Sequence, residues 1–555
     1  MRKKYQKALA MALSLCLSAS ALSGCRSSTQ ANQKKVSQVA PASQLTFPLS
    51  QKQTLTGLTT YPVGSEQNPN NRTIFKRMES NTNVHINWTA IQADQWGDKV
   101  RLLMASGSTL PDFIFNADFS DEDLLRYSGQ GAIINLEDYI NKYMPNLNTV
   151  YQKYPNYKKM SMDEDGHILA LPWIEQLGKD KEAIQTVGGN MSFINKKWLD
   201  FLRLKTPTTV DEFEKVLLAF KNKAGAIQKQ FNIDGTIIPM SCIINDQDPG
   251  LLINGFGAGY GDNDLDRHIA VTDSGKVICT ATQDGYKKGI DWLHKLYAEG
   301  LIDKESFTQK WATYVSKGKA GRYGVCFTWD VANIDNLKDW EPLPALKADT
   351  TNITPCNGSF TSGFGRGKCV ITSNCKNIPL TCTWLDQMYK PMQSAQNNWG
   401  TYGDANKFNI FEMSKNSKGE PMLKHEKLEG NSPVEVRETQ SVGGPLAVLN
   451  DYYNVYVTCP DDAAYRLNWI KTTYTPDMHN KYVYPNVFMN ADDTQKLSDL
   501  QADIKKYINN KRSSWIMNGG IDNDWNSYMN ELNKYGLSDY LGILQKYYDQ
   551  YNKSK

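Results

Sequence analysis

The sequence predicts an α/β protein with more than one lobe, and three observations support this. From Leu55 onwards, segments with the two-residue period of strands alternate with segments of helical period. Two consecutive strand–helix units imply a parallel sheet, because parallel strands need a crossover connection. A chain of 555 residues with 40% hydrophobic and 22% charged residues has room for two to four lobes and an ordinary globular composition.

The first lobe is predicted to begin with a strand at Leu55 and a helix over residues 72–80. Apolar and polar residues alternate over 84–88, which indicates a strand, and an apolar stripe at Val100, Leu103 and Met104 indicates a helix that stops at Gly107. Further elements follow in order: a short buried strand over 111–115, helices over 121–127 and 136–143, and a turn over 165–167 that leads into the segment 168–173. We place the first crossing between lobes at this segment.

The second lobe contains the most clearly predicted helices. After a strand over 192–194 and a helix over 196–202, Thr209 and Glu212 have the spacing of a capping box. The apolar positions that follow have the helical period, and they are Phe213, Val216, Leu217 and Phe220. A second helix is predicted over 283–299, with Gly300 as its stop.

The rest of the chain continues the same alternation. Strands are predicted over 324–329 and 367–371, and a helix over 381–389. The C-terminal part is predicted to be helical, because two apolar stripes recur there at helical spacing: Leu497, Leu500, Ile504 and Ile508, then Trp525, Met529 and Leu532. Five tryptophans fall on such stripes and are predicted to be core residues: Trp88, Trp198, Trp292, Trp384 and Trp515.

The N-terminus has the layout of a secretory signal peptide over residues 1–24. Four basic residues precede an apolar run from Ala8 to Leu22 that is too short for a typical membrane span. Small residues then precede Cys25, a pattern that resembles a bacterial lipobox. This resemblance implies cleavage before Cys25, a diacylglyceryl group on its thiol with fatty acyl chains such as palmitate, and an anchor on the extracellular face of the cytoplasmic membrane. The alternative is an ordinary secretory cleavage site.

Residues 25–50 are predicted to form a flexible stalk, because they are rich in Ser, Gln, Ala and Lys and have little to bury. Without residues 1–24, 58 basic residues face 59 acidic ones, a net charge of −1, which argues against nucleic acid as a partner. Eight cysteines remain after Cys16 and Cys25 are set aside. Their spacing fixes no disulfide pairing, and we treat them mainly as small buried hydrophobic residues.

Several motifs together resemble the extracellular solute-binding proteins of ABC importers, over almost all of the mature chain. Those of the first lobe are Leu103-Met104-Ala105-Ser106-Gly107, Leu110-Pro111-Asp112, Tyr143-Met144-Pro145-Asn146 and Asp165-Gly166-His167. Those of the second are Ile194-Asn195-Lys196-Lys197-Trp198-Leu199, Pro207-Thr208-Thr209 and Glu299-Gly300-Leu301-Ile302-Asp303. The C-terminal Trp515-Ile516-Met517-Asn518-Gly519 is similar to the long carbohydrate-binding branch, which includes alginate-oligosaccharide binders.

The resemblance implies a type II periplasmic-binding-protein fold, in which two α/β lobes close like a hinge on a ligand. It implies lobe 1 from residues 51–170 with about 360–440, and lobe 2 from 171–359 with about 441–555. The implied function is capture of an extracellular oligosaccharide for the transmembrane subunits of an ABC permease. We expect a monomer that is not an enzyme and needs no cofactor.

Sugar sites combine aromatic faces with amides and charged groups that satisfy hydroxyls, and the chain has 13 Trp and 29 Tyr. Trp329 and Asp330 lie where a strand of the second lobe ends, and the family places a ligand contact at this relative position. By position, the other candidates are Trp173, Trp399, Tyr402, Tyr127, Asn190 and Phe364. For each aromatic candidate the alternative is a place in a lobe core.

The sequence departs from the family in one loop. Relatives often have an Asp/Asn/Gly-rich loop that resembles a calcium site after the capping-box helix. Here Asp234 is the only carboxylate between Lys221 and Pro239, whereas calcium prefers six to eight oxygen ligands, several of them charged. We therefore predict no metal site in this loop.

Two other functions remain open from the sequence. A secreted glycoside hydrolase would need two facing carboxylates, and acidic clusters occur at residues 163–165 and 262–266, both in stretches typical of solvated loops. A sensory partner of a membrane receptor would use the same clamp as an importer subunit. The sugar, its length and its charge are not defined by the sequence, and a peptide ligand also remains open.

Overall fold

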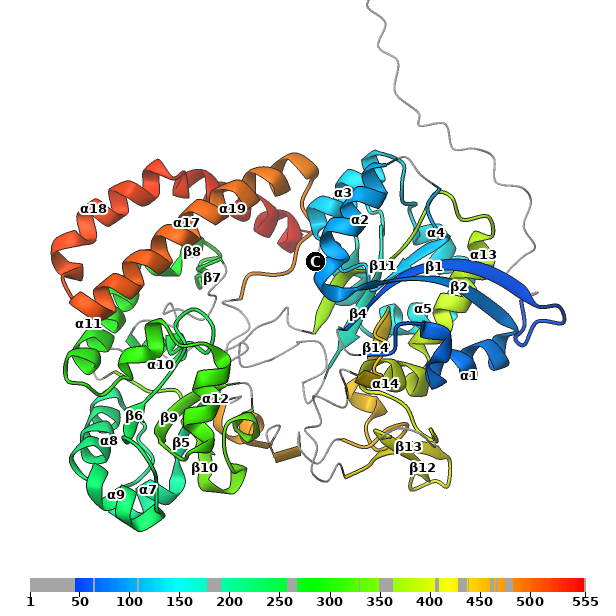
Figure 1. Ribbon diagram of the computed structural model, residues 1–555. Coiled ribbons are helices and arrows are strands. Elements are labelled where there is room, and N and C mark those ends of the chain that lie inside the picture. The colour runs from blue at the N-terminus through cyan, green and yellow to red at the C-terminus, as the bar shows by residue number, and fades with distance from the viewer. Residues whose placement is uncertain are drawn as a thin grey trace, which may run out of the picture. The chain divides into compact units, whose positions relative to one another are not determined.

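The computed structural model describes residues 45–62, 65–106, 109–176, 191–256, 267–328, 330–348, 363–404, 409–427, 437, 439–459, 464–465, 468–474 and 483–553. Within these ranges, no helix combines the length and the apolar character that a bilayer crossing requires. Two sheets, each with its own helices and core, form two α/β lobes (Figure 1).

The first lobe is built on a six-stranded sheet of order β14-β4-β11-β3-β1-β2. Its strands are β1 (Gln53–Tyr61), β2 (Val84–Gln92), β3 (Phe113–Phe115), β4 (Leu171–Glu175), β11 (Phe364–Ile371) and β14 (Leu446–Val448). β1 pairs in parallel with β2 and β3, and β14 pairs in parallel with β4. β11 is antiparallel to both β3 and β4, so five strands share one direction and the parallel sheet predicted from the sequence is interrupted by one reversed strand.

Within the described part of the chain, eight α-helices accompany this sheet. They are α1 (Thr73–Thr82), α2 (Trp96–Ala105), α3 (Asp121–Gly129), α4 (Glu137–Tyr143), α5 (Pro145–Lys153), α6 (Pro155–Ser161), α13 (Ile378–Asp386) and α14 (Pro391–Trp399). Phe113, Phe115 and Trp384 are almost fully buried between strands and helices. The predicted elements of this lobe all appear, shifted by a few residues at their ends.

The second lobe is built on a four-stranded sheet of order β10-β5-β9-β6. Its strands are β5 (Met191–Asn195), β6 (Ile238–Met240), β9 (Tyr323–Thr328) and β10 (Trp340–Pro342), and its helices include α7 (Lys196–Leu202), α8 (Val210–Asn222), α9 (Ala224–Phe231), α10 (Gly250–Ile253), α11 (Asp284–Ala298) and α12 (Trp311–Lys319). The capping box is confirmed at α8. The amide of Glu212 donates to Thr209 Oγ1 over 3.2 Å, and the Glu212 carboxylate accepts from the amide of Thr208 over 2.9 Å.

Three C-terminal helices complete the core of the second lobe: α17 (Ala491–Asn518), α18 (Ile521–Lys534) and α19 (Leu537–Lys553). Both predicted stripes are confirmed, because Ile504, Ile508 and Leu532 are buried and the other stripe residues pack against the same core. Trp198, Trp292, Trp384 and Trp515 are buried as predicted, and Trp88 packs against the first core. Two small hairpins, β7–β8 (Ile269–Val271 with Val277–Cys279) and β12–β13 (Phe411–Lys415 with Pro421–His425), complete the described strands.

The structure corrects two predicted boundaries. β4 and β14 lie in the sheet of the first lobe, although the boundaries at 170 and 440 assign them to the second. The stalk was predicted to extend to residue 50, but Phe47 and Leu49 pack against the first core, and the amide of Leu49 donates to the carbonyl oxygen of Thr82 over 3.0 Å. The composition of residues 25–50 could not predict these contacts, because they depend on two apolar side chains within a polar segment.

The cysteines behave as predicted where the structure describes them. Six of the seven described cysteines are buried: Cys242, Cys279, Cys326, Cys369, Cys375 and Cys382. Burial raises the pKa of the Cys242 thiol to about 12, which makes it a poor nucleophile. Cys356 lies outside the described residues.

Candidate functional site

The carboxyl edge of the six-stranded sheet is where five of its six strands end. In sheets of this kind, ligands bind beyond the carboxyl ends of the strands, where backbone groups and loop side chains converge. Asn116, directly after β3, is 8% exposed and bonds to the loop after residue 441: it donates to the carbonyl oxygen of Val442 over 2.9 Å and accepts from the amide of Gly444 over 2.6 Å. This side chain therefore fixes a loop at the edge.

Three half-buried side chains form a hydrogen-bonded group at the end of β4, which we call the Trp173 patch. Trp173 and Glu175 share one face of the strand, because side chains alternate along a strand. Trp173 Nε1 donates to Asn398 Oδ1 over 3.1 Å, and Asn398 Nδ2 donates to Glu175 Oε1 over 2.9 Å. Asn398 comes from the last turn of α14, so a strand and a helix hold the patch together.

The chemistry of the Trp173 patch suits a sugar. Gly365 lies opposite Trp173 in β11 and brings no side chain over the indole ring. The ring can pack against the C–H face of a sugar, and the second carboxylate oxygen of Glu175 can accept from a hydroxyl. Because the three side chains are already bonded to one another, little conformational entropy is lost when a ligand binds.

The carboxyl edge of the second sheet is arranged differently. Asp330, directly after β9, is 4% exposed, and its Oδ1 accepts from the amide of Ala332 over 2.9 Å and from the hydroxyl of Tyr465 over 2.8 Å. Tyr465 packs on Trp469, whose ring centroid lies 5.8 Å from that of Phe193. Asp330 thus caps the short helix η7 (Val331–Asn333) and holds an aromatic cluster at this edge.

The sequence did not point to Tyr465 and Trp469. They belong to short helical turns before the π-helix Ile470–Tyr474, and no periodic pattern marks that segment. The only available signal was the presence of two aromatic residues close to the point where the chain must cross between lobes.

Three other predicted ligand residues are buried, and a fourth, Tyr402, is partly buried. Trp399 is 4% exposed and packs among Phe411, His425 and Tyr453. Tyr127 is 4% exposed beside Phe119, and Phe364 stacks on Tyr157 at a centroid distance of 6.0 Å. The guanidinium of Arg77 covers the Tyr402 ring at 3.8 Å. We correct the expectation for Trp399, Tyr127 and Phe364, because a buried ring offers no free face to a sugar. Tyr402 is partly buried with one face of its ring covered, and it stays a prediction.

The remaining predicted residues cannot be placed. Cys25, Asn190 and Trp329 lie outside the described residues. Of the predicted ligand residues, the structure therefore presents Trp173 as a half-buried ring that packs against the first core and bonds to Asn398, and it adds Glu175 and Asn398 beside it.

The described residues also bear on metal binding and hydrolysis. They contain no group of three or more His, Cys, Asp or Glu side chains placed to hold a metal ion. In the acidic cluster at 163–165, Asp163 Oδ1 accepts from the amides of Asp165 and His167 over 3.0 and 2.8 Å, so this carboxylate closes a turn. The cluster at 262–266 lies outside the described residues.

Comparison with known proteins defines the class. Residues 67–393 match the model of the bacterial extracellular solute-binding protein family, and the chain belongs to this family. It is 45% identical over 516 residues to the fructooligosaccharide ABC transporter substrate-binding protein FusA of Streptococcus pneumoniae, covering 92% of this chain and 93% of that one.

Solved structures agree with this assignment. The S. pneumoniae FusA EF-hand mutant in complex with fructo-nystose superposes with a TM-score of 0.80 at 44% identity, covering 90% of this chain and 100% of that one. The alginate-binding protein AlgQ2 without calcium ion superposes with a TM-score of 0.64 at 21% identity, covering 91% and 99%, and so shares the fold. The predicted family and the type II fold are confirmed.

Proposed function

We propose that this protein is the substrate-binding subunit of an ABC importer and that it captures an extracellular oligosaccharide. The observation that carries the proposal is the Trp173 patch: an indole, an amide and a carboxylate bonded together at the carboxyl edge of the first sheet. Membership of the solute-binding family and the 45% identity to a fructooligosaccharide-binding relative support it. The ligand class we propose is a short fructooligosaccharide, which is neutral and rich in hydroxyl groups.

In this proposal each residue of the patch has one task. Trp173 provides the apolar surface for a sugar ring, Glu175 accepts hydrogen bonds from hydroxyls, and Asn398 holds both in place. Asp330 acts as a positioning residue that fixes the Tyr465–Trp469 cluster at the second edge. Trp329 and Asn190 remain candidates for direct ligand contacts from the second lobe.

The cellular setting also belongs to the proposal. The lipobox-like sequence supports cleavage before Cys25, acylation of that residue and attachment to the extracellular face of the membrane. We propose a monomer that closes its two lobes on the sugar and delivers it to the permease subunits. The lobes would comprise 45–176 with about 363–457, and 191–348 with about 464–553, which revises the sequence-based boundaries by the strand pairing.

The experiment is a thermal-shift titration of the purified mature protein with kestose, nystose and, as a contrast, oligogalacturonate. A ligand that binds only the folded state raises the melting temperature with its concentration. We expect kestose and nystose to raise it, oligogalacturonate to have no effect, and chromatography to recover the sugars intact. Consumption of the sugar would favour the glycoside hydrolase, and a flat response to both fructans would refute the proposed ligand class.

The anchor needs a separate experiment. Cys25→Ala should move the protein from the membrane fraction into the medium, with Cys16→Ala as the matched control that stays on the membrane. Retention of the Cys25→Ala variant in the membrane would contradict lipid attachment at this residue.

A further inference from the structure

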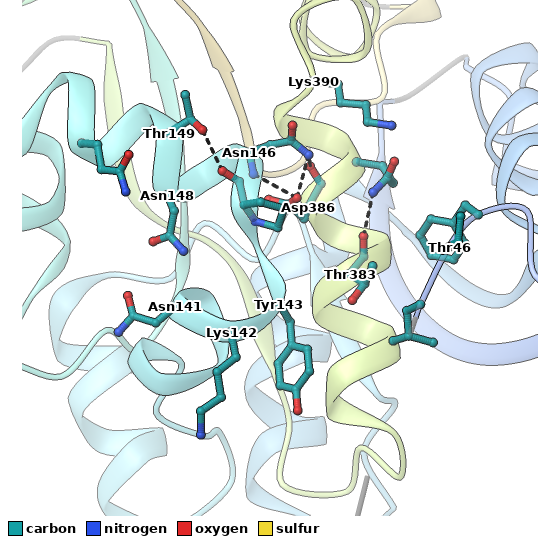
Figure 2. A pocket seen from close by; sticks show the side chains of 15 residues that line it. Thr46, Asn141, Lys142, Tyr143, Asn146, Asn148, Thr149, Thr383, Asp386 and Lys390 are labelled. Atoms are coloured by element: carbon teal, nitrogen blue, oxygen red, sulfur yellow. Dashed lines mark hydrogen bonds between the residues drawn. The ribbon is translucent and has the colours of Figure 1, made fainter. Parts of the chain in front are cut away.

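A cavity of about 790 Å³ lies between α4, α5, α13 and the segment Leu45–Phe47 of the first lobe. Its size falls within the range of small-molecule sites. None of its lining residues belongs to the Trp173 patch, so we treat it as a separate feature, the α4–α5–α13 pocket (Figure 2).

Most residues that line this pocket carry an uncharged polar group. Nine of the fifteen carry a side-chain amide or a hydroxyl: Thr46, Asn141, Tyr143, Asn146, Asn148, Thr149, Gln152, Thr383 and Gln387. Tyr143 adds an aromatic ring, which stacks on Tyr139 at a centroid distance of 6.3 Å. Amides, hydroxyls and an aromatic face are the groups that satisfy a saccharide.

The charges in the pocket exclude a cationic ligand. Lys142 and Lys390 are exposed at opposite ends of the view, and neither forms an ion pair within the part of the chain that the structure describes (Figure 2). The carboxyl of Asp386 is 1% exposed, and protein donors occupy it: the amides of Asn146 and Leu147 at 3.1 and 3.0 Å and Asn146 Nδ2 at 2.6 Å. The charge available to a ligand is therefore positive.

Internal hydrogen bonds orient two side chains of the pocket. Asn148 Nδ2 donates to the carbonyl oxygen of Ile140 over 2.8 Å, and Gln387 Nε2 donates to that of Thr383 over 3.0 Å. Across the described residues, Asn148 Oδ1 and Gln387 Oε1 accept no hydrogen bond. Each amide therefore presents a fixed acceptor, and a sugar hydroxyl is a suitable donor.

We propose that the α4–α5–α13 pocket is a second saccharide-binding site, distinct from the site at the sheet edge. Its acceptors are Asn148 Oδ1 and Gln387 Oε1, and Tyr143 supplies the apolar surface. Because Leu45–Phe47 forms one wall, a bound sugar would contact the segment that joins the body to its predicted stalk.

Equilibrium dialysis with kestose tests this proposal by counting the sugar molecules bound per chain. We expect two in the wild type, one in Trp173→Ala, and one in the double variant Asn148→Leu/Gln387→Leu, which keeps side-chain size and removes the acceptors. Affinity for the second kestose should fall at least tenfold in the double variant. Asn533→Leu, at an exposed asparagine of α18, is the matched control and should still bind two.

The four chains separate the two proposals. If the wild type binds one kestose and only Trp173→Ala loses it, the second site is refuted and the edge site stands. If the double variant loses the only kestose and Trp173→Ala keeps it, the pocket stands and the edge assignment fails. Two molecules bound by the folded double variant would also refute the pocket.

Discussion

The edges of the two sheets carry similar residue types but use them differently. At the first edge, Trp173, Glu175 and Asn398 are half-buried and bonded to one another, which leaves an aromatic face and a carboxylate oxygen for a ligand. At the second edge, the carboxylate of Asp330 is 4% exposed and serves the amide of Ala332 and the hydroxyl of Tyr465. The difference shows that exposure and existing hydrogen bonds, rather than residue type, separate a ligand contact from a structural support.

Trp173 and Trp399 show the same contrast within one lobe. Trp173 belongs to the patch, and Trp399 follows the patch residue Asn398 in α14. Yet Trp399 is 4% exposed within the first core, whereas Trp173 packs against that core and is only partly buried. The neighbouring positions on α14 point in different directions because successive helical residues are about 100° apart.

The largest effect that tests this contrast is on stability. Trp399→Ala should lower the free energy of unfolding by about 3–5 kcal/mol, because it leaves a cavity among Phe411, His425 and Tyr453. Chemical denaturation monitored by circular dichroism would measure it. A stable variant with weakened sugar binding would return Trp399 to the ligand site.

Trp173→Ala should produce the opposite result. We expect kestose affinity to fall about tenfold to a hundredfold, roughly 1.4–2.7 kcal/mol, because the ring is the main apolar contact of the patch. Isothermal titration calorimetry would measure this loss. Trp173→Phe keeps a ring but loses the bond to Asn398 Oδ1, so an intermediate affinity is expected. Unchanged affinity in Trp173→Ala would remove the patch from the site.

Sequence reasoning predicted the fold more closely than the site, and α8 shows why. The capping box and the stripe from Phe213 to Phe220 are local patterns, and both are present in the structure. The patch depends on β4, β11 and α14 meeting, which no local pattern describes. Trp173 was found because it follows the predicted crossing, whereas Glu175 and Asn398 acquire their role only through contacts distant in the chain.

The aromatic candidates failed for a related reason. An aromatic residue at the end of an element can face a ligand or fill a core, and the local sequence does not distinguish these two roles. In the structure, Trp399, Tyr127 and Phe364 are buried. For Tyr402, only the fold reveals that Arg77 lies over its ring. Burial is a property of the assembled lobe.

Two buried groups of the first lobe, Asp386 and His425, have pKa values shifted in opposite directions, so the stability of this lobe depends on pH. Desolvation by burial raises the pKa of Asp386 to about 6, and desolvation followed by the charge of Arg437 lowers the pKa of His425 to about 3. The Asp386 contribution to stability is full below about pH 4 and is lost as pH rises towards 6. The His425 contribution is full above about pH 6.5 and is lost as pH falls towards 3. The two slopes oppose each other between about pH 4 and 6.

Each group can be removed to expose the slope of the other. We expect the stability of Asp386→Asn to rise with pH between 4 and 6, and that of His425→Gln to fall, each relative to wild type by up to about 1.4 kcal/mol per pH unit. Urea denaturation at several pH values measures both. Parallel pH profiles in the two variants would contradict the opposing shifts.

The smallest expected effect concerns calcium at the loop after α9. Two backbone carbonyl oxygens of this loop already accept hydrogen bonds from protein side chains, as the carboxylate of Asp330 does from protein donors. Gln228 Nε2 donates to the carbonyl oxygen of Gly235 over 2.6 Å, and Arg322 Nε donates to that of Thr236 over 2.9 Å. Asp234 is the only carboxylate in this loop, and the adjacent guanidinium of Arg322 would repel a cation. We therefore expect the melting temperature to stay the same with added CaCl₂ or EDTA, whereas a rise that scales with calcium concentration would show a metal site that the residue pattern did not predict. Arg322→Gln removes the positive charge, so calcium stabilisation in this variant alone would show that Arg322 is what keeps the ion out.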